Sequence, residues 1–61
     1  MKHILNTIEE TSIELFKDDI DNSVCIGVRN GENFSVIWLD ESDLYELIGV
    51  LHHLQKQLKN G

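Results

Sequence analysis

The stretch that decides the fold is SVCIGVRNGENFSVIWLD, residues 23–40, in which two apolar runs flank an Asn-Gly pair. The alternating residues are Val24, Ile26 and Val28 in the first run, and Phe34, Val36 and Trp38 in the second. Alternation with a period of two is typical of a strand with one buried face, and Asn-Gly is a strong hairpin signal. The stretch therefore predicts a β-hairpin.

The length of the hairpin loop decides which side chains share a face, because a slip of one residue turns a whole strand over. A two-residue loop made of the Asn-Gly pair would place the two apolar runs on opposite faces. A three-residue loop at residues 29–31 pairs Ile26 with Phe34, so that all six apolar residues share one face. We therefore expect the three-residue loop, with Gly31 in a left-handed conformation at a bulge.

A long amphipathic helix is predicted after the hairpin, over residues 41–59. Its apolar residues recur three and four positions apart, as on one buried helix face. They are Leu44, Leu47, Ile48, Leu51, Leu54 and Leu58. Asp40 is placed to cap the first turn, and Asn60-Gly61 is a stop signal.

Upstream of the hairpin, TSIELFKDD at residues 11–19 predicts a further strand with Ile13 and Leu15 pointing inward. A polar turn at residues 18–23 joins it to the next strand. In the first ten residues, the apolar positions fit either one helical turn or a strand.

The predicted fold class is α+β, in a single small domain over residues 1–61. A three-stranded antiparallel meander at residues 11–39 carries the long C-terminal helix packed on one face, and residues 1–10 stay unassigned. The opposite face of the sheet would carry Phe16, Cys25, Ile37 and Leu39. This apolar surface is either a contact site or is covered by the first ten residues.

Composition narrows the class of protein. A chain of 61 residues is marginally stable alone, and a single cysteine excludes an intrachain disulfide. Self-association is one way in which so small a domain gains stability, so we expect a homodimer. The lone thiol fits the cytoplasm, and no apolar run is long enough to cross a bilayer. A net charge of −6 opposes direct binding to nucleic acid or to an anionic membrane.

None of the chemical signals predicts an enzyme, a cofactor or a metal site. His52 and His53 are adjacent, so they point about 100° apart on a helix, and no ligand type lies four residues from either. Cys25 lies in the middle of a strand without a neighbouring base. The acidic run at residues 17–23 lacks the glycine and the glutamate of a calcium loop.

Gly49 is unusual because an interior glycine costs a helix roughly 0.5–1 kcal/mol relative to alanine. Helical projection places it in a narrow seam with Tyr45, His52 and Lys56. The missing side chain either admits a second chain at this seam or is tolerated on a solvated face.

The expected function is that of a small acidic protein-binding module. Acidic residues concentrate in the first third of the chain, at Glu9, Glu10, Glu14, Asp18, Asp19 and Asp21. A short, acidic, cysteine-poor chain of this kind is similar to small proteins encoded by phages and mobile elements. One concrete version of such a module is a phage-type inhibitor, whose acidic surface would compete for the basic groove of a nucleic-acid-binding host protein. The alternative is a structural or stabilising subunit of a larger complex, joined through apolar surface at Ile37, Leu39 or Tyr45.

Overall fold

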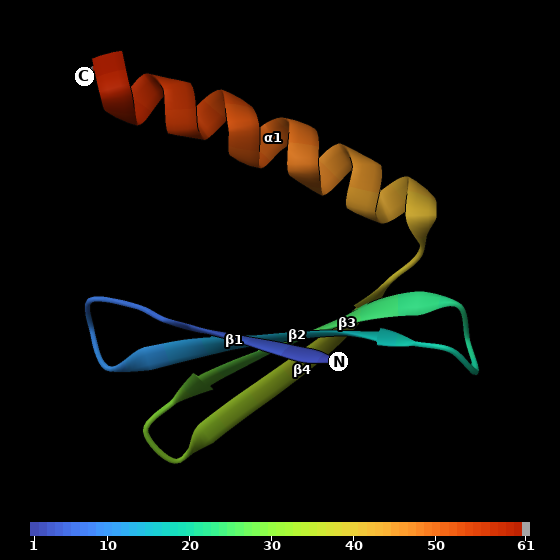
Figure 1. Ribbon diagram of the computed structural model, residues 1–61. Coiled ribbons are helices and arrows are strands. Elements are labelled where there is room, and N and C mark those ends of the chain that lie inside the picture. Colours follow the sequence, from blue (N-terminus) through green and yellow to red (C-terminus); the bar gives the residue numbers. More distant parts are fainter. Residues whose placement is uncertain (61) are drawn as a thin grey trace.

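The computed structural model describes residues 1–60 and shows an antiparallel sheet followed by one helix (Figure 1). The elements are β1 (Lys2–Asn6), β2 (Thr11–Asp18), β3 (Ser23–Asn30), β4 (Asn33–Leu39) and α1 (Glu41–Asn60). The strands lie in the order β1-β2-β3-β4, so the sheet is a simple meander. The α+β class is confirmed, but the sheet has four strands where three were expected.

The additional strand is β1, an edge strand formed by part of the segment that the sequence left unassigned. Its residues pair with β2 in order, from Lys2 opposite Phe16 to Asn6 opposite Ser12. The turn between β1 and β2 is closed by a hydrogen bond of 2.8 Å from the Thr7 N–H to the Thr11 carbonyl. The two threonine hydroxyls also lie 2.6 Å apart. The chain therefore reverses before a helical turn can form.

The turn between β3 and β4 differs from the expected one. Asn30 pairs with Asn33, which leaves a two-residue loop, Gly31-Glu32, so the predicted loop at residues 29–31 is wrong. Gly31 is left-handed as predicted, with φ 62°, and it occupies the first loop position, where a type II′ turn places glycine. Ile26 consequently pairs with Ile37 rather than with Phe34.

This register distributes apolar side chains over both faces of the sheet. We call one the helix-side face, and its apolar residues are Leu5, Ile13, Leu15, Val24, Ile26, Val28, Ile37 and Leu39. We call the other the aromatic face, and its apolar residues are Ile4, Phe16, Cys25, Phe34, Val36 and Trp38. Ile13 and Leu15 thus point inward as expected. The grouping of Ile37 and Leu39 with Phe16 and Cys25 is wrong, because the two pairs lie on opposite faces.

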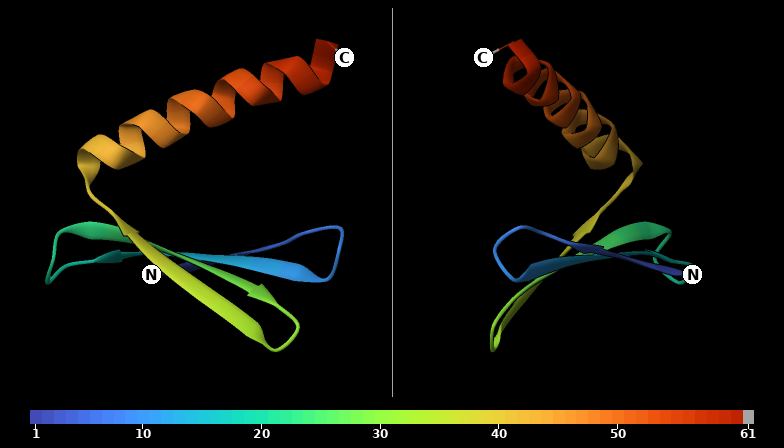
Figure 2. Two further views of the ribbon diagram at one scale, coloured as in Figure 1. Left: turned by 180° about the vertical axis from the view of Figure 1, so that it is seen from behind. Right: turned by 60° about the vertical axis from the view of Figure 1, so that its left-hand side comes forward.

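Helix α1 begins where the sequence predicted, and Asp40 caps it. The Asp43 N–H donates to the Asp40 Oδ1 at 2.8 Å, and the Leu44 N–H donates to the Asp40 carbonyl at 3.0 Å. The expectation that the helix packs along the sheet is only partly met. Leu44 and Leu47 are half-buried, whereas residues 48–60 are exposed. Figures 1 and 2 show the helix leaving the sheet at an angle.

The hydrophobic core is consequently very small. Among the described residues, Cys25 is the one apolar side chain that is fully buried, with 3% of its surface exposed. Most of the remaining apolar residues are half-buried or exposed on the two faces of the sheet and on α1. The chain therefore presents unusually large apolar surfaces for its size.

Candidate protein-binding surfaces

The first candidate surface is the wedge, which we define as the space between the helix-side face and the leucine stripe of α1. At its closed end, Val24 and Leu39 of the sheet line a depression together with Leu44 of the helix. Further along, Ile37 lines a second depression with Val50. Both sheet residues that the sequence proposed as apolar contacts, at positions 37 and 39, therefore lie in the wedge.

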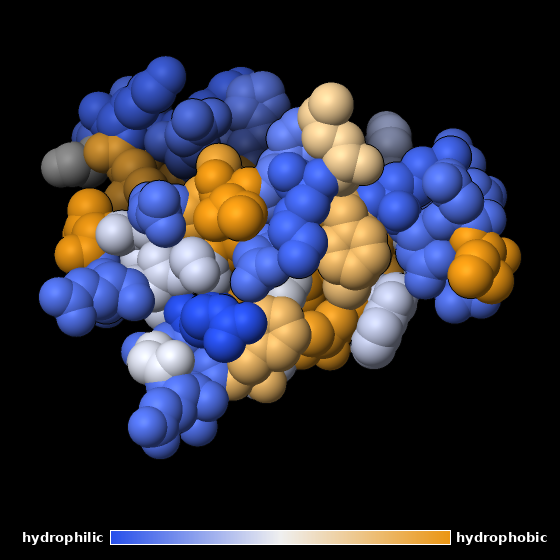
Figure 3. Space-filling view, turned by 60° about the horizontal axis from the view of Figure 1, so that its bottom comes forward, coloured by the Kyte–Doolittle hydropathy of each residue, from blue (hydrophilic) through white to orange (hydrophobic). Residues whose placement is uncertain are grey.

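The second candidate surface is the aromatic face, seen in Figure 3 as apolar side chains interrupted by hydrophilic ones. Trp38 is 57% exposed and Phe34 is 45% exposed. The Phe34 ring lies over Gly27, where a Cβ atom would stand 2.8 Å from the ring Cζ. On the same ring, the Arg29 guanidinium lies 4.5 Å from the centroid. These contacts hold the Phe34 ring between Gly27 and Arg29.

A row of charged side chains crosses the aromatic face. Glu14 lies between two cations, with an oxygen 3.1 Å from the Lys2 Nζ and the other 3.7 Å from the Arg29 Nε. Lys2 in turn stands 5.8 Å from the centre of the Phe16 ring. The Glu14 side chain is only 15% exposed, so this predicted acidic contact residue is neutralised within its own chain. Phe16, also a predicted contact residue, lies beside the row.

The other acidic residues do not form one continuous surface. Glu9 and Glu10 lie in the loop between β1 and β2, whereas Asp19 and Asp21 lie in the loop between β2 and β3. Figure 1 shows these two loops at opposite ends of the sheet. Because the strands are antiparallel, the acidic residues expected to form one cluster are separated between the two ends of the sheet.

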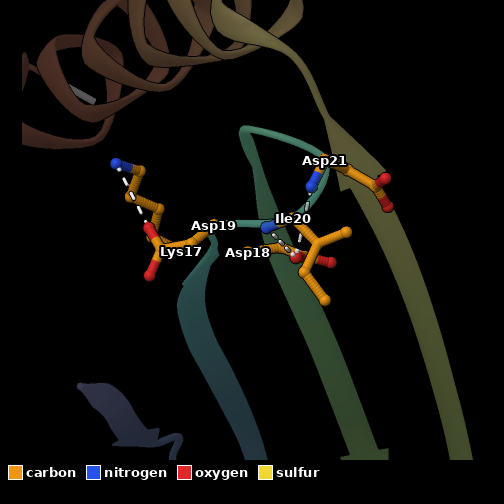
Figure 4. A network of polar contacts seen from close by, with 5 residues as sticks. All are labelled: Lys17, Asp18, Asp19, Ile20 and Asp21. Atoms are coloured by element: carbon orange, nitrogen blue, oxygen red, sulfur yellow. Dashed lines mark hydrogen bonds and ion pairs between the residues drawn. The ribbon is translucent and has the colours of Figure 1, made fainter.

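At the loop between β2 and β3, the carboxylate of Asp18 forms hydrogen bonds that shape the turn (Figure 4). The Asp18 Oδ1 accepts hydrogen bonds from the N–H groups of Ile20, at 3.0 Å, and Asp21, at 3.4 Å. This is the local bonding by which aspartate favours turns. Asp19 pairs with Lys17 at 3.4 Å. Asp18 thus has a structural role in addition to its charge.

The seam of Tyr45, Gly49, His52 and Lys56 is exposed on α1. Stepping about 100° per residue places it roughly opposite the helix positions that line the wedge. Among the described residues, nothing lies within 4 Å of the point that a Gly49 Cβ would occupy. The seam is therefore free to contact another chain, and its role as an interface stays a hypothesis.

Residues 1–60 contain no group of three or more His, Cys, Asp or Glu side chains arranged to hold a metal ion. The Nε2 of His53 lies 3.2 Å from the side-chain nitrogen of Gln57 on the helix surface. Within the same residues, no helix combines the length and apolarity that crossing a membrane requires.

Comparison with known proteins identifies no relative: no family model, curated protein or solved structure matches this chain. The function must therefore be inferred from the exposed surfaces of the chain. Sequence reasoning missed the aromatic face because it assigned Phe34 and Trp38 to the core. Gly27 was the available signal, since a glycine inside a strand often marks the close approach of another group.

Proposed function

We propose that this protein is a non-catalytic protein-binding module of the cytoplasm that joins a larger complex through its aromatic face. The observation that carries the proposal is the exposure of Trp38 and Phe34 on the same face, with Arg29 stacked on the Phe34 ring. Tryptophan and arginine are enriched among the residues that contribute most binding energy to protein interfaces. A sheet also holds such side chains rigidly, so little conformational entropy is lost on binding.

The charge of this face favours a protein partner over a nucleic acid. Exposed aromatic rings stack on bases when cations accompany them along the strand. Here both nearby cations, Lys2 and Arg29, already pair with Glu14. The net charge of −6 adds a long-range repulsion from phosphates. An apolar groove on another protein is the better complement.

Replacing Trp38 with Ala tests this proposal. We expect the affinity for the partner captured from the native host to fall roughly thirtyfold, which corresponds to about 2 kcal/mol for a residue of this kind. Calorimetry with the purified partner measures the change, and circular dichroism checks that the variant is folded.

Ile20→Ala is the matched control, because Ile20 is 94% exposed in a loop outside both surfaces. It should bind like the unmodified chain. Equal affinity of the Trp38→Ala variant and this control would contradict the proposal.

A second candidate function rests on the acidic end of the molecule. Asp40 and Glu41, at the start of α1, line one depression together with Asn22 from the acidic loop. Asp19 and Asp21 of that loop add to this negative surface. Such a surface could compete for the basic, nucleic-acid-binding groove of a host protein. Binding would then weaken steeply with added salt, whereas binding through the aromatic face would not.

A further inference from the structure

The chain exposes far more surface than a compact protein of its mass. Its accessible area is 5492 Å², against about 4,000 Å² expected for a folded monomer of 7.0 kDa. Its radius of gyration is 13.2 Å, whereas a compact domain of this length has about 10.5 Å. The surplus area is about 1,500 Å² per chain, and the open wedge accounts for the extended shape.

The two walls of the wedge are apolar surfaces of complementary kinds. The sheet wall includes Ile37, which is exposed, and Ile26, which is half-buried. On the helix wall, Ile48, Leu51 and Leu54 are each about half exposed. A helix stripe and a sheet face are the surfaces that pack on each other in α+β proteins. Whatever fills the wedge must therefore present an apolar surface to it.

The chain's own helix cannot cover the helix-side face. Four strands spaced about 4.8 Å apart make a sheet roughly 19 Å wide. A helix with its side chains is about 10–12 Å across, so one helix covers little more than half of that width. A single residue, Asp40, also separates β4 from α1 and limits where the helix can lie. The sheet needs a second helix.

We propose that the wedge is filled by α1 of a second copy of this chain. In this twofold dimer, α1 of each copy lays its leucine stripe on the helix-side face of the other copy, so that each sheet is covered by its own helix and by that of the other copy. The two copies use the same patch, as twofold symmetry requires. Two surpluses set an upper limit of about 3,000 Å² on the buried area, and obligate homodimers bury about 2,000 Å² or more.

A second copy explains the wedge better than an unrelated partner does. The chain already carries the missing element, because its own leucine stripe is unpartnered beyond Leu47. One symmetric association closes both wedges at once and buries both stripes. The charged residues that line the two depressions of the wedge are Asp40, Glu41, Asp43 and Glu46 at the helix and Lys17 on the sheet. None of them belongs to the leucine stripe.

The direct test combines solution mass with isotope-filtered nuclear Overhauser measurements on a mixture of labelled and unlabelled chains. We expect a mass of twice 7.0 kDa. We also expect contacts between copies, from the methyl groups of Leu51 and Leu54 to those of Ile13 and Ile26. A monomer at all concentrations, or a dimer in which these contacts are absent, would overturn the inference.

A pair of helix variants provides a second test. Leu54→Glu places a charge in the stripe and should raise the dimer dissociation constant at least a hundredfold. Tyr45→Glu places the same charge on the opposite side of the helix and should leave it unchanged. Loss of the dimer in the Tyr45→Glu variant alone would move the interface to the seam and overturn the inference.

If Leu54→Glu proves unfolded, the filtered measurements on the unmodified chain still decide the question. The inference is independent of the proposed partner surface, because the aromatic face lies on the other side of the sheet. Failure of partner capture would therefore leave the dimer standing, and a monomeric mass would leave the aromatic face standing.

Discussion

At the scale of single residues, Gly27 explains why the aromatic face has its present form. The position lies opposite Val36, and the absence of a side chain lets the Phe34 ring lie across the strand. Arg29, which pairs directly with Phe34, then stacks on that ring. One missing Cβ thus allows an aromatic ring and a cation to be stacked on the sheet.

Gly27→Ala is expected to destabilise the fold by about 1 kcal/mol, the low end of the usual cost of overpacking, because the half-exposed Phe34 ring can move away. The new Cβ would stand 2.8 Å from the Phe34 ring, which must move away and give up its position over the strand. Denaturant unfolding measures the loss of stability, and the chemical shifts of the Phe34 ring report its displacement. An equally stable variant with unchanged ring shifts would refute this account.

At the scale of elements, α1 is the part of the structure that packs least against the rest of the described chain. Its first turns are held by the Asp40 cap and by the half-buried Leu44 and Leu47. Its later turns expose the apolar stripe to water. Most helical stability in proteins comes from packing of the apolar face rather than from helix propensity. The second half of α1 therefore needs the covering that the proposed dimer supplies.

Gly49→Ala tests which side of this helix is used. The space around Gly49 is open, so the variant should gain about 1 kcal/mol of stability from helix propensity and keep its mass in solution. Thermal unfolding and solution mass measure the two effects, and Gly27→Ala is the matched change with the opposite expected sign. Loss of association would instead show that the seam with Tyr45 and His52 is an interface.

At the scale of the whole molecule, net charge and apolar surface act in opposite directions on association. Two copies that each carry a net charge of −6 repel each other, whereas burial of the wedge favours the dimer. Folding and association are linked in such a protein, because too little of a single chain is buried to stabilise it alone. The stability of the fold should therefore depend on the concentration of the chain.

We expect the unfolding temperature to rise with protein concentration and to rise further, or hold, when salt is added. Salt screens the repulsion between the two copies and leaves the apolar contact intact. Differential scanning calorimetry over a dilution series in low and high salt measures both dependences. An unfolding temperature independent of concentration would indicate a monomer that is stable alone.

Much of the fold was predictable from local signals. The strands over residues 11–39, the start of the helix and the left-handed Gly31 follow from alternation, capping and turn chemistry that act over a few neighbouring residues. The register in which β3 pairs with β4 did not follow from these local signals. A single core would require the two apolar runs to share a face, but Asn30 pairs with Asn33 and the runs lie on opposite faces.

The sequence by itself determined the α+β class, the alternating strands and the amphipathic helix, because these depend on periodicity and on local hydrogen bonding. Only the tertiary structure decided the fourth strand, the two-residue turn, the split of the acidic residues between two ends and the exposure of Trp38. Each depends on which residues meet across the sheet. In a chain that buries little beyond Cys25, no dominant core restricts that choice.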